Sequence, residues 1–385
     1  MVEVGETPVR PRVPRYFYVV PMSGHRIQMR SAHKTVILSG NAVKSVERLL
    51  KLSDGTRDLA QIVAEFPDIP EEEVLRTIRK LRDKGLIEDA EQKARDLRRE
   101  AEGGAAENAD REDQTTFFSM ICRDGRIAQD LLRNSHVVVF DLGRVGSHAA
   151  VFLTRAGIGK ITVIDDEAVD RSQVWSSGTY LPGDLGRLRS EVIRERLTQM
   201  DSDVKVEVAS VSVNDVREVA GVLRGANLAL VCADSPAVSI YRTVNAAALQ
   251  ENVRWLRASL EGFEAQLGPC VLPRETACYT CYELRVKGNW SNYDENLAFE
   301  EYLCTADAGG VDFGCLAPTS GLLGSLAALE CLKLLTGFSY PMTCGKLWRF
   351  NMNTFEARAH EVLKLPRCPS CGLTAHSPAE AQWAL

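Results

Sequence analysis

Membrane-spanning segments are absent from this 385-residue sequence, in which no apolar run reaches the roughly 18 to 20 residues that a spanning helix needs. Residues 1–15 also lack the apolar core of a secretory signal, so we expect a cytoplasmic protein. Positive charge is not in excess either, because 46 Lys and Arg residues stand against 52 Asp and Glu residues, for a net charge of -6. This balance argues against a chain that binds nucleic acid over its whole surface.

A disulfide framework is not expected, because the 11 cysteines cannot all pair and disulfides are rare in a reducing compartment. The 6 histidines show no spacing typical of a pair of metal ligands, and we find no internal repeat. What is present is the composition of an ordinary globular protein, with 45% hydrophobic and 25% charged residues. At about 150 residues per domain, the length suggests two or three domains.

Residues 1–88 have the pattern of a small α+β module. Three short segments rich in β-branched and aromatic residues predict an antiparallel meander; they are Tyr16–Pro21, His25–Met29 and Thr35–Leu38. Three helices follow, of which the second is capped by Asp58, and the third starts at Pro70 and stops at Gly85. We interpret this block as a winged-helix-like module.

The rest of the chain divides into three further parts. Residues 89–113 are charged and Ala-rich and predict a linker or an exposed helix, and residues 372–385 predict a tail. Between them, residues 114–371 alternate strands with helices, which predicts an α/β fold of the Rossmann type with a mostly parallel sheet. The expected strands are His136–Phe140, Ile161–Ile164, Val204–Ala209 and Leu228–Cys232, and the expected helices are Ser147–Ala156, Leu188–Gln199 and Gly321–Thr336.

A glycine turn joins the first of these strands to its helix. Gly143 and Gly146 would let backbone N–H groups approach a phosphate at the helix N-terminus. Asp165, at the end of the next strand, stands where an acid can bond a ribose hydroxyl. Asp141, however, occupies a position where a dinucleotide fingerprint has glycine, and its carboxylate would repel a phosphate. The turn therefore predicts either a nucleotide site or only close packing of a helix on a strand.

Two cysteine pairs have metal-ligand spacing. Cys278 and Cys281 form one Cys-x-x-Cys pair, and Cys368 and Cys371 form the other. Four thiolates are the ligand set of a tetrahedral structural zinc, which leaves no open position for water. Two unrelated reduced pairs, or a redox pair, are the alternatives. A nucleophilic role is conceivable for Cys304, although no histidine lies near it in the sequence.

The third block resembles the ThiF/MoeB-like superfamily, which contains the adenylating domains of ubiquitin-activating enzymes and their bacterial relatives. The resemblance rests on the two cysteine pairs and on the segments VVVFDLGRVGSHAAVFLTRAGIGKITVIDDEAVDRSQ, DLGRLRSEVIRERL, ALVCADSPAVS and APTSGLLGSLAALECLKLLTG. It implies a Rossmann-like adenylating fold, a homodimer and a structural Zn²⁺ held by the four cysteines. It also implies that ATP with Mg²⁺ binds at the glycine turn and activates a carboxylate as an acyl-adenylate.

Carried over by position, the resemblance assigns roles to individual residues. It implies that Asp234 and Arg189 act in catalysis, the aspartate with magnesium and the arginine as a cation on the triphosphate. The residues implied for nucleotide binding are Gly143, Gly146, Asp165 and Arg144.

Several positions depart from the family pattern. Asp141 and Arg144 replace glycines, Arg189 stands in place of a lysine, and Ser176 stands in place of an arginine. An Asn position of the family falls at about Gln173. Because positions for cations are lost or changed, we expect a degenerate ATP site.

The first block resembles the precursor-peptide recognition element of enzymes that modify ribosomally made peptides. The residues that carry this are VRPRVPRYFYVV, HRIQMR, KTVILSG and the helical segment from LLKLSDGTRDLAQIVAEF to KLRDKGLIED. The resemblance implies that a leader peptide adds as a strand along Lys34–Leu38, opposite the third helix. The implied peptide-binding residues are Lys34, Val36, Leu38, Arg76, Lys80 and Lys84. A winged helix that binds DNA or only packs is the alternative.

Together the two resemblances predict a leader-peptide-binding, ThiF-like subunit of a pathway that makes ribosomal, bacteriocin-type peptide products. Such a subunit would present the precursor to a separate modifying enzyme such as a YcaO cyclodehydratase, since no segment of this chain resembles one. The alternative is an ATP-dependent enzyme that adenylates the precursor itself, as in microcin-type and pantocin-type relatives. A third hypothesis is activation of a sulfur carrier, as in thiamin or molybdopterin synthesis.

Overall fold

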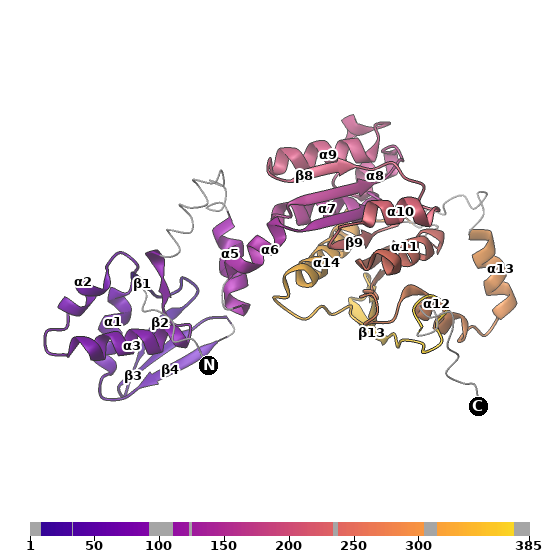
Figure 1. Cartoon of the computed structure of the whole chain (residues 1–385). Helices are drawn as coiled ribbons and strands as arrows, with labels where there is room; N and C mark the ends of the chain where they lie inside the picture. The colour runs from indigo at the N-terminus through magenta and orange to yellow at the C-terminus, as the bar shows by residue number, and fades with distance from the viewer. Residues whose placement is uncertain are drawn as a thin grey trace, which may run out of the picture. The chain divides into compact units, whose positions relative to one another are not determined.

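The computed structural model describes residues 9–32, 34–91, 111–122, 125–233, 238–303 and 314–372. The chain divides into two compact units, Met1–Arg126 and Ile127–Leu385, and Figure 1 colours it from indigo to yellow along its length. None of the helices in the described ranges has the length and apolarity to cross a membrane. Most of the predicted linker and nearly all of the predicted tail fall outside the described residues, so those two assignments remain predictions.

The first unit contains the predicted antiparallel meander. Its three-stranded sheet has the order β2-β3-β4, and each strand lies within two residues of its predicted position. The strands are β2 (Tyr18–Met22), β3 (Arg26–Arg30) and β4 (Thr35–Ser39). A short pair that the sequence did not predict, β1 (Pro11–Arg12) with β5 (Glu88–Asp89), ties the start of the module to its end.

Three helices cover one face of this sheet and supply its core. They are α1 (Val43–Leu52), α2 (Leu59–Ala64) and α3 (Glu71–Asp83), and α5 (Glu112–Ile121) follows later in the unit. Asp58 and Gln61 form a capping box at the start of α2, as expected for this N-terminus. Ile27 and Met29 of β3 are fully buried together with Ile62 and Ile78 of the helices, so the sheet and the helices share one core.

The second unit is built on an eight-stranded sheet of order β13-β12-β11-β10-β9-β6-β7-β8. From β10 to β8 all neighbours are parallel, which confirms the predicted Rossmann-like sheet, whereas β10 to β13 are antiparallel. The parallel strands are β6 (His136–Phe140), β7 (Lys160–Ile164), β8 (Lys205–Val208), β9 (Leu228–Val231) and β10 (Arg254–Glu261). The antiparallel ones are β11 (Glu264–Leu267), β12 (Lys346–Asn351) and β13 (Glu356–Glu361).

Helices such as α7 and α10 cover the sheet (Figure 1), and nine helices of the described residues follow α5 along the chain. They are α6 (Gly125–Arg133), α7 (Arg144–Ala156), α8 (Arg171–Ser176), α9 (Arg189–Met200), α10 (Val216–Leu223), α11 (Val238–Glu251), α12 (Tyr279–Lys287), α13 (Tyr293–Leu303) and α14 (Ala317–Thr336). Helix α7 starts three residues before the predicted position, directly at the glycine turn. Helix α14 packs against α7. The close approach requires glycine at position 324, because a Cβ there would lie only 2.6 Å from His148 Cβ and would clash with it.

Candidate functional site

The glycine turn lies where β6 ends and α7 begins. The carboxyl ends of parallel strands β6, β7 and β9 meet at this edge, which is where open α/β sheets bind ligands. Gly143 is the N-cap of α7. A Cβ on Gly146 would lie 1.9 Å from the carbonyl oxygen of Asp141, so only glycine fits there. Close packing therefore accounts for Gly146.

Two backbone N–H groups of the turn already bind carboxylates of the chain. Leu142 N–H donates to Asp165 Oδ2 at 2.7 Å, and Gly143 N–H donates to Asp141 Oδ1 at 2.6 Å. Asp141 adopts φ 66°, the left-handed conformation in which glycine is usual and aspartate is tolerated. The N–H groups of Leu142 and Gly143, which a phosphate would use, are thus occupied by the chain's own acids.

Arg189, at the start of α9, is drawn into the same cluster. Its side chain is 7% exposed, and its Nη2 lies 2.5 Å from Glu167 Oε2. Its Nε donates to Gln173 Oε1 at 2.9 Å. Its Nη1 lies 3.5 Å from Asp165 Oδ2 and 3.8 Å from Asp141 Oδ1. The cation that the sequence offered to a triphosphate is held by three carboxylates in this structure.

The cluster carries more acid than base. Burial, and then the neighbouring charge of Asp141, raise the pKa of Asp165 to about 6 in spite of Arg189. The Tyr180 hydroxyl closes the cluster by donating to Leu142 O at 2.5 Å, and burial followed by the charge of Asp165 raises its pKa. Three carboxylates against one guanidinium would oppose a triphosphate unless further cations entered with it.

The remaining residues of the predicted nucleotide site are less fully defined. Arg144 is the first residue of α7 and is partly buried, and Asp234 lies outside the described residues. Sequence reasoning missed Glu167 and Tyr180. The acidic run from Asp165 to Glu167 at the end of a predicted strand was a signal for the first. Nothing in the sequence points to Tyr180, which reaches the turn only because its loop folds back.

The four cysteines of the two pairs converge on one point. Cys278, Cys281, Cys368 and Cys371 are buried, and their sulfur atoms all lie within 4.8 Å of one another. Neighbouring sulfurs are 3.5 to 3.9 Å apart, and tetrahedral Zn–S bonds of about 2.3 Å would place them roughly 3.8 Å apart. The donor set therefore fits a tetrahedral metal ion such as zinc.

Local structure shapes each half of this cysteine cluster. Cys278 is the N-cap of α12 and Cys281 lies in its first turn, whereas Cys368 and Cys371 lie in a tight turn closed by Gly372 N–H to Cys368 O at 2.8 Å. The Leu365 N–H donates to Cys281 Sγ at 3.4 Å. Such backbone N–H groups orient the sulfur ligands of metal sites.

In the first unit, β4 bonds to β3 on one side only among the described residues. Lys34 Nζ, at the start of β4, donates to the carbonyl oxygen of Lys84 at 2.7 Å, so β4 and the end of α3 lie side by side. Val36 and Leu38 are partly buried and pack on the core of the module. The predicted cations on α3 are exposed; they are Arg76, Lys80 and Lys84.

The backbone of β4 has a definite direction. Lys34 O accepts from Ser31 N–H, and Gly40 N–H donates to His25 O. Alternate residues of an antiparallel strand bond the same neighbour, so Val36 and Leu38 direct their N–H groups to β3. The backbone N–H and C=O groups of Ile37 therefore point to the outer edge of β4, and the peptide-binding role of Val36 and Leu38 stays a prediction.

Comparison with known proteins identifies the larger part of the chain. The signature of the ThiF family matches residues 112–372. The sulfur carrier protein ThiS adenylyltransferase of Escherichia coli is 30% identical over 244 residues, which are 63% of this chain and 88% of that protein. The molybdopterin-synthase adenylyltransferase of E. coli is 25% identical over 244 residues, 63% of this chain and 90% of that protein.

Solved structures show the same fold over a longer stretch. E. coli MccB in complex with ATP has a TM-score of 0.69 and 20% identity, and the match covers 94% of this chain and 99% of MccB. MccB, described as a microcin C7 biosynthetic enzyme, has also been solved with N-formylated MccA, with a TM-score of 0.70. PaaA matches 91% of this chain with a TM-score of 0.66 and 17% identity. Each of these matches covers more of the chain than residues 112–372 and the few residues after them contain, so each extends into the first unit.

Proposed function

Because the chain belongs to the ThiF family, we propose that it is a leader-peptide-binding member that serves a ribosomal peptide modification pathway. It captures a precursor peptide on its first unit and presents it to a modifying enzyme. The observation that carries this proposal is the open edge of β4 beside α3, in a module that precedes the family domain. The fold match with MccB, solved with N-formylated MccA, supports it because the match includes this module.

The edge of β4 suits strand addition. Ile37 directs its backbone N–H and C=O outward, and its side chain is 52% exposed. An extended peptide would bond these groups and lie between β4 and α3. Lys80 and Lys84 on α3 favour an acidic leader segment, since a like-charged peptide would be repelled.

Presentation has a physical advantage for a weakly bound core peptide. Once the leader is held, the core meets a modifying enzyme at an effective concentration of up to about millimolar. A separate enzyme of the YcaO type and a homodimeric state, both expected from the sequence, belong to this proposal. So does a structural Zn²⁺ at the four cysteines, which would hold α12 to the C-terminal turn.

Adenylation of the bound peptide is a second candidate function. It is favoured by the convergence of Asp165 and Arg189 on the glycine turn, at the edge where the family fold binds ligands. ATP would supply the adenylyl group that joins the peptide carboxylate, with release of pyrophosphate. Gly143, Gly146 and Arg144 would hold the ATP. For this to happen, the bonds from Asp141 and Asp165 to the turn must be exchanged for bonds to the nucleotide.

Binding to the full chain tests the leading proposal. The probe is a library of fluorescently labelled acidic peptides of leader length, and the tightest binder is titrated by anisotropy. Ile37→Pro removes the outward N–H of β4 without removing a bond to β3, and we expect at least a tenfold loss of affinity. Ile37→Val keeps the N–H and should bind normally. Full affinity in the Ile37→Pro protein would contradict strand addition on β4.

Pyrophosphate release separates the two candidate functions. The purified protein is incubated with ATP, Mg²⁺ and the bound peptide, and released pyrophosphate is measured. Presentation predicts no release beyond the background of the protein without peptide. Peptide-dependent release that disappears in Asp234→Asn would establish adenylation instead.

A further inference from the structure

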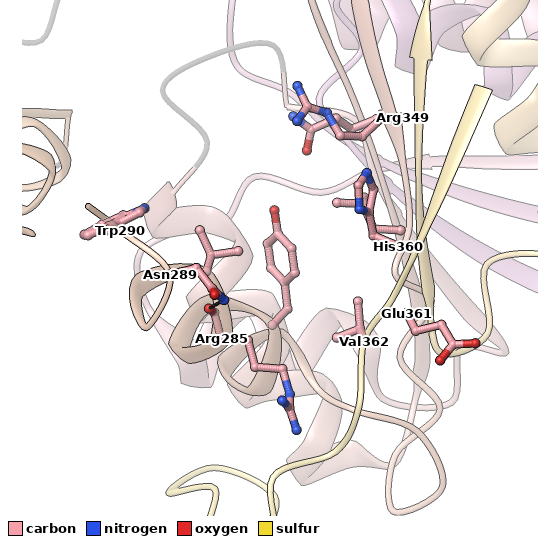
Figure 2. Close-up of a pocket in the computed structure, with 11 residues that line it drawn as sticks. Arg285, Asn289, Trp290, Arg349, His360, Glu361 and Val362 are labelled. Atoms are coloured by element: carbon pink, nitrogen blue, oxygen red, sulfur yellow. Dashed lines mark hydrogen bonds between the residues drawn. The ribbon is translucent and has the colours of Figure 1, made fainter. Parts of the chain in front are cut away.

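A cavity of about 490 Å³ lies in the second unit between α12 and strands β11–β13 (Figure 2). Arg349 of β12 and His360 of β13 project into it from the strands, and Trp290 lies on the opposite side. Arg285 and Glu361 also border it, but in Figure 2 their charged groups point away from the centre. The space is thus lined by apolar, aromatic and polar groups, and on the strand side it has Arg349, whose Nη2 lies 3.7 Å from Glu264 Oε2.

A buried arginine lies directly behind the wall of this cavity. Arg257 of β10 is 7% exposed, and its Nη2 donates to Gln266 Oε1 at 2.7 Å. Its guanidinium also stacks over Tyr282, 5.5 Å from the ring centroid. Gln266 and Tyr282 both line the cavity, so they separate Arg257 from the cavity by a single side chain.

The charge of Arg257 is incompletely satisfied. It also donates to Ser259 Oγ at 3.3 Å, lies 4.8 Å from the Tyr241 ring centroid and hydrogen-bonds the Tyr241 and Tyr282 side chains, whereas its Nε has no hydrogen-bond partner. Within the described residues no carboxylate forms an ion pair with it. A buried charge held only by neutral groups is costly and is stabilised by an anion that approaches it.

Resting on the peptide-binding function proposed above, we infer that this cavity binds the carboxylate of an acidic residue in the peptide substrate. The carboxylate enters beside Tyr282 and Gln266 and bonds the guanidinium of Arg349, while the positive charge of Arg257 attracts it from behind those two side chains. A planar guanidinium matches a carboxylate in a two-point hydrogen bond. The apolar lining of Val286, Leu347 and Val362 receives the flanking side chains.

The edge of the sheet explains why the ligand is a peptide. Strand β13 is the last strand of the sheet among the described residues, and all of Glu356–Glu361 is exposed. A peptide that runs along β13 would place alternate side chains over His360 and into the cavity. A small anion such as phosphate would use the cations but not the apolar lining or the edge.

Two matched peptides test this inference on the full-length protein. The probes are acetyl-Gly-Val-Glu-Val-Gly-amide and its Gln counterpart, with binding measured by ligand-observed NMR and calorimetry. We expect the Glu peptide to bind about tenfold more tightly and the preference to fall at least fivefold in Arg257→Gln and in Arg349→Gln. Lys346→Gln, on β12 with its side chain exposed and outside the cavity lining, is the matched control and should keep the preference.

Each outcome decides the inference. Equal binding of the two peptides, or an unchanged preference in Arg349→Gln, would overturn it, and Arg349→Gln decides alone where Arg257→Gln does not fold. Displacement of the Glu peptide by equimolar inorganic phosphate would also overturn it, by showing a general anion site. The Ile37→Pro protein separates the two proposals, since it should lose the acidic leader-length peptide but keep the Glu preference.

Discussion

The cysteine cluster and the glycine turn were both predicted from short motifs. The cysteine cluster gathers ligands of one kind, whereas the polar groups at the glycine turn bond one another. The four sulfurs of the cysteine cluster gather within 4.8 Å, and every one of them is a donor of the same kind. At the glycine turn the predicted groups meet donors and acceptors supplied by the chain itself, such as Asp165 for Leu142 N–H and Glu167 for Arg189. The donor set of the cysteine cluster therefore fits an added metal ion, whereas the groups at the turn already bond one another.

This difference sets the cost of binding at each place. A metal ion at the cysteines displaces the thiol protons, which pass to solvent, and weak sulfur contacts, but no bond to another part of the chain, so its binding energy adds to folding. A nucleotide at the turn must displace Asp141 and Asp165 from the N–H groups they hold. Its apparent affinity is the intrinsic affinity multiplied by the fraction of molecules in which those bonds are open. Four substitutions can break or sharpen this comparison.

Cys281→Ser should have the strongest effect. A structural Zn²⁺ contributes on the order of 10 kcal/mol in small metal-binding domains, which is comparable to the whole stability of a domain, about 5 to 15 kcal/mol. We expect one zinc per chain in the native protein and insoluble or unfolded protein after the substitution. Metal analysis and thermal unfolding measure both.

A cysteine outside the cluster is the control for this prediction. Cys315 is partly exposed and bonds only weakly to Leu316 and Thr319, so Cys315→Ser should keep the metal and the native melting temperature. If the native protein is folded and soluble but contains no metal, the cysteine cluster does not depend on a metal ion, and the difference from the glycine turn disappears.

Arg189→Gln should have the next strongest effect, because the chain's own cation closes the turn. Removing it deprives Asp141, Asp165 and Glu167 of the guanidinium that they share. Breaking a buried ion pair from one side costs about 3 to 5 kcal/mol. Urea denaturation at pH 7.5 should show a loss of that size.

Arg194→Gln is the matched control, since Arg194 lies on the same helix and is exposed. Its stability should stay within about 0.5 kcal/mol of the native protein. If both variants unfold at the same urea concentration, the turn is not held by Arg189 and is open to a nucleotide.

The sequence predicted the parallel half of the sheet better than the antiparallel half. Strands β6 and β9 are wholly or almost wholly buried. They appear in the sequence as continuous apolar runs, a pattern that predicts buried parallel strands. Strand β13 is exposed along its whole length and has no apolar alternation, so nothing in its sequence marks it as a strand. It forms because β12 provides a partner over six residue pairs.

The two sites show the same limit. The cysteine spacing was sufficient because four identical ligands have one common use. The state of the glycine turn depends on Tyr180, whose position follows from loop geometry, and on Gln173, the capping-box residue of α8 that also accepts from Arg189. Arg257 did leave a signal, as a charge inside the otherwise buried strand β10, but its partners come from three other elements.

Asp165→Asn should raise stability at neutral pH. The pKa of Asp165 is raised to about 6, from an ordinary value of 3.8, so the folded state favours the protonated form. Its contribution to stability is complete below pH 3.8 and is lost as the pH rises through 6. The amide of Asn keeps an acceptor for Leu142 N–H without the charge, and Arg189 retains Glu167.

The measurement is stability against pH for Asp165→Asn and the native protein. We expect the variant to be more stable by about 2 kcal/mol at pH 8 and the difference to vanish towards pH 4. Asp203→Asn, at an exposed position after α9, gives the baseline for removal of one acid. A variant less stable than the native protein at pH 8 would mean that Arg189 outweighs burial and Asp141.

Asp141→Gly should have the smallest effect, and it tests the turn directly. Glycine adopts φ 66° without strain, and it removes the carboxylate that now occupies Gly143 N–H. Freeing one N–H and one negative charge should strengthen ATP binding about tenfold, or about 1.4 kcal/mol. Calorimetric titration of ATP with Mg²⁺ measures it, with Asp166→Gly as the control beside the turn. If the native protein already binds ATP as tightly as the Asp141→Gly protein, the turn opens without cost, and presentation loses its advantage over adenylation.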